Sequence, residues 1–369
     1  MKMPAAVIRE EISKRGAISF ARFMEIALYC PETGYYETKK DIIGQRGDFI
    51  TSVSTGSFFG ELLAFQFAEW LKEMPAPAHQ LTLVEAGAHS GQLAADILNW
   101  LQTNRPELFE RIEYVIIEPS PHRRQWQQQT LSKFGKKVRS VVRLSESPSV
   151  QRGDTSSGTI IFSNELLDAF PVHRFGWDAA KKEWFEYGVS LDGEDFVWSK
   201  IPVVRDAGFM PADIPPSLLE VLPDGYIVET SPAAEAWWRE AAAILSNGKI
   251  LTIDYGYTAE EQFSPARQKG TLRAYHQHHV TDDLLANPGG QDLTAHINFS
   301  AVQTTGETAG LRTEQFCTQP QFLTRILQKA VAQKEKTFTQ LTPKQIRQFQ
   351  TLTHPDHLGR AFRVLVQAR

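Results

Sequence analysis

The stretch that decides the fold is LTLVEAGAHSGQLAADIL, residues 81–98. Apolar and β-branched residues lead to Glu85, a turn with Gly87 and Gly91 follows, and apolar residues then recur at helical spacing. A strand, a tight loop and a helix N-terminus form the unit that holds a nucleotide-like cofactor at the carboxyl edge of a parallel sheet. Because Glu85 precedes the glycines, a pyrophosphate would be repelled there and a cationic cofactor attracted.

The composition is that of a globular protein, with 42% hydrophobic and 22% charged residues in 369. A net charge of −4 gives no sign of the basic face of a nucleic-acid binder, so we expect no nucleic-acid partner. The two cysteines, Cys30 and Cys317, argue against a disulfide framework and against a thiolate metal site. We find no signal peptide and no apolar run that would span a membrane, and we expect a cytoplasmic protein.

Short runs that are apolar on both faces suggest a parallel sheet covered on both sides. They are separated by helical or loop lengths and lie at 81–85, 113–118, 138–143, 159–163 and 249–254. We therefore predict an α/β fold with a mostly parallel sheet and helices on both faces.

The rest of the pattern divides the chain into three parts. Residues 1–60 read as an N-terminal helical cap, with Ser19 as the N-cap of one helix, followed by a polar lid loop. Residues 61–265 form the core, with inserted antiparallel hairpins at 172–229, where aromatic and β-branched residues alternate between turn signals. Residues 266–369 read as a mixed α/β part that completes the sheet and the acceptor side of the site, and they end in a closing strand.

Glu118 ends the second predicted strand. An acid at this place commonly accepts hydrogen bonds from the ribose hydroxyls of an adenine nucleoside, although it could also be solvated or cap a helix. The loop between Gly87 and Gly91 lacks the third glycine of the Gly-x-Gly-x-x-Gly pattern that dinucleotide enzymes use, which disfavours a nicotinamide dehydrogenase. S-adenosylmethionine has a sulfonium cation and no phosphate, so an acid followed by a glycine turn suits it better.

Polar residues also end the fourth predicted strand, where they would face the same cleft. Asn164 can donate and accept hydrogen bonds, and Glu165 and Asp168 could share one face of a turn. Taken one at a time, these acids are better explained without a catalytic role, Asp168 as the cap of the following turn and Glu165 as a solvated side chain. The histidines and aspartates between 276 and 296 lack a recognised ligand spacing, so we expect no metal site.

Taken together, the motifs resemble the class I S-adenosylmethionine-dependent methyltransferases. More narrowly, the chain resembles the MidA-like branch that contains the mitochondrial complex I assembly arginine methyltransferase and its bacterial relatives. The similar segments follow the family order and lie at 31–36, 47–52, 59–62, 118–121, 164–171, 254–256, 270–275 and 292–299.

The resemblance implies a Rossmann-like core with a seven-stranded sheet and methyl transfer to a protein side chain, an arginine in the mitochondrial member. It implies S-adenosylmethionine as the cofactor and a methyl acceptor as the partner, while a homodimer is an open alternative. The cofactor contacts that it implies are Asp48, Phe49, Thr51, Ser52, Glu85, Gly87, Gly91 and Glu118. It places Asn164, Glu165 and Asp168 on the acceptor side as the catalytic residues.

Two departures from the family pattern leave alternatives open. Ala88 and His89 stand where the family usually has a proline and a second glycine, although a histidine adopts a positive φ at modest cost. Residues 53–57 also differ from the family, close to where the acceptor would lie. A small-molecule O- or N-methyltransferase and a catalytically silent assembly or binding protein of the same fold are therefore the alternatives to a protein methyltransferase.

Overall fold

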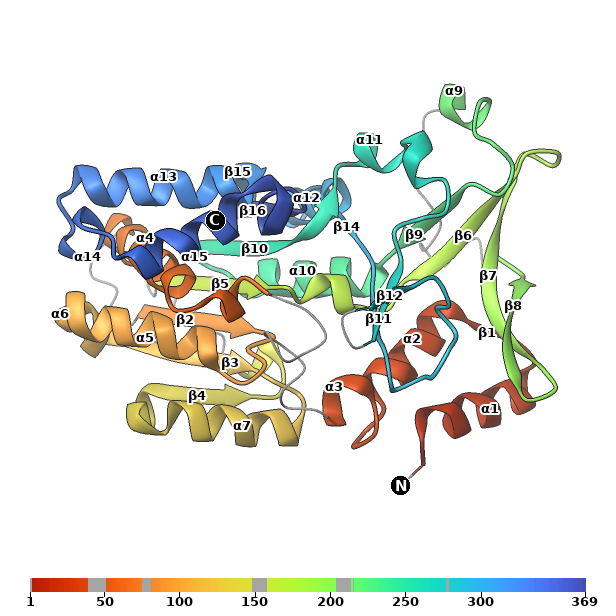
Figure 1. The fold of residues 1–369 in the computed structure, drawn as a ribbon, viewed down its shortest axis with the longest axis horizontal. Helices are drawn as coiled ribbons and strands as arrows, with labels where there is room; N and C mark the ends of the chain where they lie inside the picture. The colour runs from red at the N-terminus through yellow and green to blue at the C-terminus, as the bar shows by residue number, and fades with distance from the viewer. Residues whose placement is uncertain are drawn as a thin grey trace.

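The computed structural model describes residues 2–38, 51–74, 81–147, 158–203, 214, 216–276 and 279–369. Figure 1 shows a large sheet with helices on both faces and a smaller antiparallel sheet at one end of the molecule. No helix in these described ranges is both long and apolar enough to cross a membrane.

The main sheet has the strand order β15-β16-β10-β5-β2-β3-β4, and β14 pairs with the end of β10. Its strands are β2 (Leu81–Ala86), β3 (Ile112–Ile117), β4 (Val138–Val141), β5 (Gly158–Asn164), β10 (Gly248–Tyr257), β14 (Ile297–Asn298), β15 (Arg312–Thr318) and β16 (Phe362–Ala368). β16 runs antiparallel to both of its neighbours, whereas β10, β5, β2, β3 and β4 are parallel. The predicted mostly parallel seven-stranded sheet is confirmed, with β14 as an addition.

Helices cover both faces of this sheet because its strands alternate apolar side chains toward each face. One face packs against α4 (Phe58–Glu73), α5 (Gln92–Asn104), α6 (Pro106–Arg111), α7 (Pro121–Leu131), α13 (Gln319–Ala332), α14 (Lys336–Thr339) and α15 (Pro343–Thr353). The other packs against α10 (Pro232–Ile244) and α12 (Phe299–Thr308). Trp238 of α10 is fully buried in this second layer, and its indole N–H donates to Gln367 of β16.

The insertion at 172–229 forms the antiparallel sheet that its alternation predicts. The order is β1-β7-β6-β9, with β8 on β7, over β1 (Ile18–Ser19), β6 (His173–Asp178), β7 (Glu183–Asp192), β8 (Asp195–Ile201) and β9 (Ile227–Thr230). The sequence did not predict that β1 joins this sheet from the N-terminus. α1 (Pro4–Arg15) and α2 (Phe20–Tyr29) pack beside it, and the predicted cap is confirmed because Ser19 accepts from the Arg22 amide.

A third small sheet lies close to the carboxyl edge of the main sheet. It consists of β11 (Arg273–His276), β12 (His279–Thr281) and β13 (Asp292–Thr294). The short helices are α3 (Tyr35–Thr38), α9 (Pro216–Leu219) and α11 (Ala259–Gln262). β13 contacts α2 and the turn that follows β5, so three distant parts of the chain meet where the parallel strands end. The three-part division of the chain stays a prediction.

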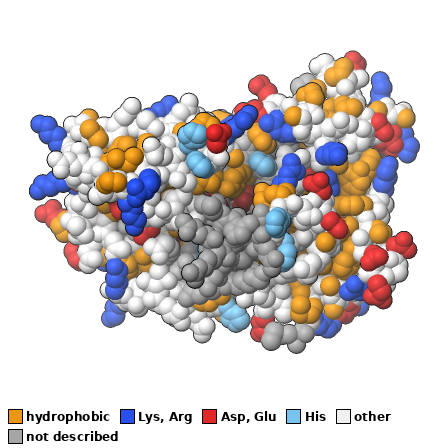
Figure 2. Space-filling model, in the orientation of Figure 1, with side chains coloured by type: hydrophobic (Ala, Val, Ile, Leu, Met, Phe, Trp, Pro, Cys, Tyr) orange, Lys and Arg blue, Asp and Glu red, His pale blue; other side chains and the backbone are white. Residues whose placement is uncertain are grey.

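On the described part of the face in Figure 2, basic and acidic side chains are interspersed over the surface. This distribution agrees with the near-neutral balance of 39 basic and 43 acidic residues. Several acidic side chains are instead buried near the carboxyl ends of the parallel strands, among them Glu85, Glu118, Asp168 and Asp254.

Candidate active site

The glycine loop between β2 and α5 takes a backbone shape that needs its glycines. The φ angle is 78° at Gly87, 44° at His89 and 83° at Gly91. His89 therefore adopts the positive φ that is expected at this place in the loop. A Cβ atom on Gly87 would lie 2.9 Å from the Leu166 side chain, and one on Gly91 would lie 3.0 Å from Leu131. The loop therefore packs tightly against α7 on one side and against the turn after β5 on the other.

Glu118 lies at the end of β3 and is 1% exposed. Its Oε1 accepts from the Ser120 amide at 2.9 Å and lies 3.1 Å from Nε of Arg123, while its Oε2 accepts from Nε2 of Gln127 at 3.2 Å. Burial raises the pKa of Glu118, and the nearby Arg123 guanidinium opposes that shift. Gln127 also donates to the carbonyl oxygen of His89 at 3.0 Å, which links the carboxylate directly to the glycine loop.

Glu85, the acid before the glycines, is also buried. Its exposed fraction is 3%, and the hydroxyl of Tyr114 donates to its Oε2 at 2.6 Å. Burial is the main cause that raises the pKa of Glu85 to about 7. Glu85 pairs in register with Ile116 of β3, two residues before Glu118. A contact between Glu85 and the cofactor stays a prediction.

The turn after β5, residues 164–169, brings the predicted catalytic residues together, and we call it the acid loop. Glu165 has a φ of 51°, a left-handed conformation that is uncommon outside glycine. Its Oε1 accepts from the Ser52 amide at 3.1 Å and from the Asn164 side chain at 3.0 Å. Burial outweighs these hydrogen bonds and raises the pKa of Glu165 to about 8.

Asp254, at the carboxyl end of β10, holds the acid loop in place. It is fully buried, and its Oδ2 accepts from the amides of Leu166 at 3.1 Å and Leu167 at 2.9 Å. Its Oδ1 accepts from the Tyr255 amide at 2.8 Å. Burial raises the pKa of Asp254 to about 7 against the pull of these amides. Because it accepts from two amides of the acid loop, the buried Asp254 side chain fixes the turn that carries Glu165.

Asp168 lies close to three other acids, Asp254, Glu165 and Asp292. Burial and the charges of Asp254, Glu165 and Asp292 hold its pKa well above the ordinary range. Tyr29 of α2 donates its hydroxyl to the carbonyl oxygen of Ala169 at 2.9 Å, which ties the cap to the acid loop.

A second tyrosine of the cap, Tyr36, reaches the same acidic group. Its hydroxyl donates to Oδ1 of Asp292 at 2.8 Å, and its ring stacks on that of Tyr29. Within the described ranges, no ion pair involves Glu165, Asp168 or Asp254. The predicted acceptor side is therefore a group of buried and partly buried acids bordered by tyrosines.

The structure brings the predicted residues into two adjoining groups. Gly87 and Gly91 belong to the glycine loop, and Gln127 links Glu118 to it. The second group is the acid loop with Asn164, Glu165 and Asp168, and its Leu166 side chain packs against Gly87. Thr51 and Ser52 are buried, and Ser52 contacts Glu165. Asp48 and Phe49 lie outside the described residues. The roles of all these residues stay predictions.

The sequence reasoning missed five residues that border these groups: Tyr29, Tyr36, Gln127, Asp254 and Asp292. Tyr36, Asp254 and Asp292 lie in segments that resemble the family, but the segments alone assign them no role. Tyr29 and Gln127 lie in helices whose patterns read as ordinary amphipathic or polar surface.

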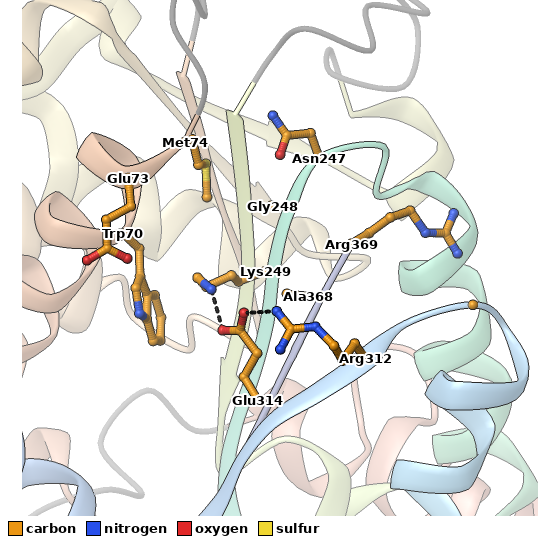
Figure 3. Close-up of a pocket in the computed structure, with 11 residues that line it drawn as sticks. Trp70, Glu73, Met74, Asn247, Gly248, Lys249, Arg312, Glu314, Ala368 and Arg369 are labelled. Atoms are coloured by element: carbon orange, nitrogen blue, oxygen red, sulfur yellow. Dashed lines mark hydrogen bonds and ion pairs between the residues drawn. The ribbon is translucent and has the colours of Figure 1, made fainter.

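A pocket of about 500 Å³ lies elsewhere, at the amino ends of the parallel strands. Figure 3 shows Lys249 and Arg312 directed at the carboxylate of Glu314, with Trp70 on the opposite wall. Its charges are largely paired with one another, and none of the predicted site residues lines it. A ligand of the glycine loop would bind outside the carboxyl ends of the strands, which is the opposite edge of the sheet.

The residues present fit S-adenosylmethionine. The backbone of the glycine loop leaves no room for a Cβ at Gly87 or Gly91, as expected where a ligand and a helix approach closely. Two buried acceptors border the two groups and lack a partner in the described part of the chain, Oε1 of Gln127 and Oδ1 of Asn164. Among the described residues, no group of three or more histidine, cysteine and acidic side chains could hold a metal ion.

Solved structures define the class of protein. The chain is 30% identical to a protein from Burkholderia thailandensis whose crystal structure is bound to S-adenosyl-homocysteine, with a TM-score of 0.82 over 99% of this chain and 92% of that one. The native structure of a Burkholderia thailandensis protein aligns with a TM-score of 0.80, also at 30% identity. The fold is thus that of a class I methyltransferase, as the strand order already indicates.

Residues 62–317 match the model of a family described as "Putative S-adenosyl-L-methionine-dependent methyltransferase". The chain belongs to this family, and the predicted family and cofactor are confirmed. It is 32% identical to the mouse protein arginine methyltransferase NDUFAF7, mitochondrial, and 31% identical to the human protein of that name, over 79% of this chain. The aligned part spans 66% of each of these two relatives.

The first prediction concerns the ribose acid. Replacing Glu118 with alanine removes an acceptor whose charge-assisted hydrogen bonds contribute about 1.5–3 kcal/mol each. We expect the affinity for S-adenosylhomocysteine, measured by calorimetry, to fall by more than about tenfold. The exposed Glu110, mutated to alanine, is the control and should bind as the wild type does. Unchanged affinity in a folded Glu118→Ala variant would refute the ribose role.

The second prediction concerns the residue that holds the acid loop. Asp254→Ala leaves three backbone amides, those of Leu166, Leu167 and Tyr255, without this acceptor, and the free energy of unfolding in urea should fall by about 2–4 kcal/mol. The exposed Asp282, mutated to alanine, should change it by less than about 0.5 kcal/mol. Equal stability of the two variants would show that Asp254 does not hold the loop.

The third prediction concerns pH. The pKa of Glu165 is about 8 in the folded protein and 4.5 when the side chain is exposed in the unfolded chain. Between these values the folded state keeps a proton that the unfolded state has lost, so this group lowers stability progressively as pH rises from 4.5 to 8.

Glu165→Gln removes this dependence because glutamine cannot ionise. We expect the variant to become more stable than the wild type by about 1–3 kcal/mol at pH 8.5, and by less at pH 5.5. Chemical denaturation at both pH values measures the difference, with the exposed Glu260→Gln as control. A stability difference that stays constant with pH would contradict the raised pKa.

Proposed function

We propose that this protein transfers a methyl group to a guanidinium nitrogen of an arginine side chain in a protein substrate. The observation that carries the proposal is the acid loop, where the partly buried Glu165 and the buried Asp168 lie beside Asp254 with no ion pair in the described ranges. The relatives named as protein arginine methyltransferases support the same acceptor.

A guanidinium is the cation that suits such a group. Buried carboxylates are costly unless a cation and hydrogen-bond donors offset their desolvation. The guanidinium is planar, always charged and offers parallel N–H donors that match carboxylate oxygens in pairs. Glu165 and Asp168 lie within one turn and can engage it together, while the tyrosine hydroxyls of Tyr29 and Tyr36 are already used on Ala169 and Asp292. The acceptor nitrogen would then be held by the acid loop beside the glycine loop.

The chain's residues would act by orientation and proton acceptance. The bound cofactor supplies an activated methyl group on a sulfonium, so alignment of the acceptor is the main requirement. As the new N–C bond forms and the S–C bond breaks, the guanidinium nitrogen gives up one proton and the sulfonium becomes a neutral thioether. Burial favours the protonated forms of Glu165 and Asp168, whereas a bound guanidinium favours their ionised forms. An ionised carboxylate of this pair can receive that proton and release it to water.

Labelled methyl transfer tests this proposal. The protein is incubated with methyl-labelled S-adenosylmethionine and a lysate from source cells that lack the gene, and labelled proteins are hydrolysed to amino acids. We expect label in methylated arginine. Asp168→Asn should lower the incorporated label by about tenfold or more, because one carboxylate of the guanidinium site is lost, and should leave cofactor affinity within about twofold. The exposed Asp282→Asn is the matched control.

The other outcomes identify the alternatives. Label only in the non-protein fraction would indicate a small-molecule O- or N-methyltransferase, and label in another amino acid would reject arginine. Binding of S-adenosylhomocysteine without any transfer would indicate a silent assembly or binding protein. No binding at millimolar concentration would reject every enzyme reading.

A further inference from the structure

Gln127 is a buried glutamine in the middle of α7 that no family motif in the sequence includes. Only 1% of its surface is exposed, although α7 is otherwise a polar helix whose neighbouring Gln128 faces solvent. Its side-chain nitrogen donates to the carbonyl oxygen of His89 at 3.0 Å and to Oε2 of Glu118 at 3.2 Å. One amide group therefore joins the glycine loop to the acid at the end of the next strand.

The chemistry of the two partners fixes the orientation of this amide. The His89 carbonyl oxygen and the Glu118 carboxylate only accept hydrogen bonds, so the NH₂ group must face both of them. Oε1 then faces away from both partners, is buried and has no partner in the described part of the chain. Buried acceptors without a donor are rare in proteins, and they often mark a place where a ligand or water completes the set.

The backbone of α7 is held at the same place. A Cβ atom on Gly91 would lie 3.5 Å from the Cα atom of Gln127, which shows that the helix packs directly on the glycine loop. The connection through Gln127 is therefore short and stiff, because it joins a packed helix, a loop with two left-handed glycines and a buried strand end.

We propose that Gln127 is a positioning residue of the cofactor site, which fixes the ribose-binding carboxylate of Glu118 relative to the glycine loop. The ribose and the amino-acid end of one ligand must reach these two elements at the same time, so their separation determines affinity. The inference rests on cofactor binding at Glu118, which the Glu118→Ala variant tests separately.

A substitution by glutamate separates this role from simple space filling. Gln127→Glu keeps the size of the side chain but replaces the donor with a second carboxyl beside Glu118 and the His89 carbonyl. Two carboxyls at such a distance share one proton, and that proton is lost as pH rises. The variant should therefore bind the ligand in a strongly pH-dependent way, which a merely structural residue would not cause.

The experiment is titration calorimetry with S-adenosylhomocysteine on the full chain between pH 5.5 and 8.5. Each variant is compared with the wild type at the same pH, so that the raised pKa of Glu118 itself cancels. We expect Gln127→Glu to bind within about threefold of the wild type at pH 5.5 and about thirtyfold or more weaker at pH 8.5. Gln128→Glu adds the same charge on the exposed side and should follow the wild type at every pH.

A second variant keeps the proposal testable if Gln127→Glu does not fold. Gln127→Met fills a similar volume without a donor, and we expect it to weaken binding about tenfold at all pH values. Wild-type affinity in Gln127→Met, or a Gln127→Glu affinity whose ratio to the wild type is constant with pH, would overturn the inference and leave the cofactor assignment intact. A wild-type protein that binds no S-adenosylhomocysteine would overturn both.

Discussion

The arrangement of this site depends on a group of carboxyl side chains that lies where the parallel strands end. Asp168 and Asp254 are buried and Glu165 is partly buried, and burial is the first cause of the raised pKa of each. Ionised carboxylates in such a place are unfavourable unless hydrogen-bond donors and a cation offset their desolvation. The backbone amides of the acid loop hold this group through Asp254, and a cationic acceptor is the partner that its chemistry favours.

On the predicted cofactor side, hydrogen bonds set the positions of the side chains. Both carboxylate oxygens of Glu118 accept hydrogen bonds, and Gln127 donates both to Glu118 and to the His89 carbonyl oxygen of the glycine loop. Leu166 then packs against Gly87, so the acid loop rests on the same glycine loop from the other side. The glycine loop and the acid loop are therefore joined by a few close contacts. A substitution that moves one loop should also shift the other.

The sequence predicts those parts whose signal is local. Strands that are apolar on both faces, the cap at Ser19 and the strand–loop–helix unit around Gly91 all follow from neighbouring residues. It does not predict partners far apart in the chain, such as Tyr29 with Ala169, because neither residue carries a pattern for the contact. The two-residue strand at Ile18 is too short to show any periodicity. Gln127 was missed because α7 reads as a polar surface helix.

The most direct test of the central claim is a crystal structure of the protein with S-adenosylhomocysteine bound. The ribose hydroxyls should bond to Glu118, the amino-acid end should lie against the loop of Gly87 and Gly91, and the sulfur should face the acid loop that carries Glu165. A ligand bound instead in the pocket beside Trp70, or one with its ribose away from Glu118, would contradict the account.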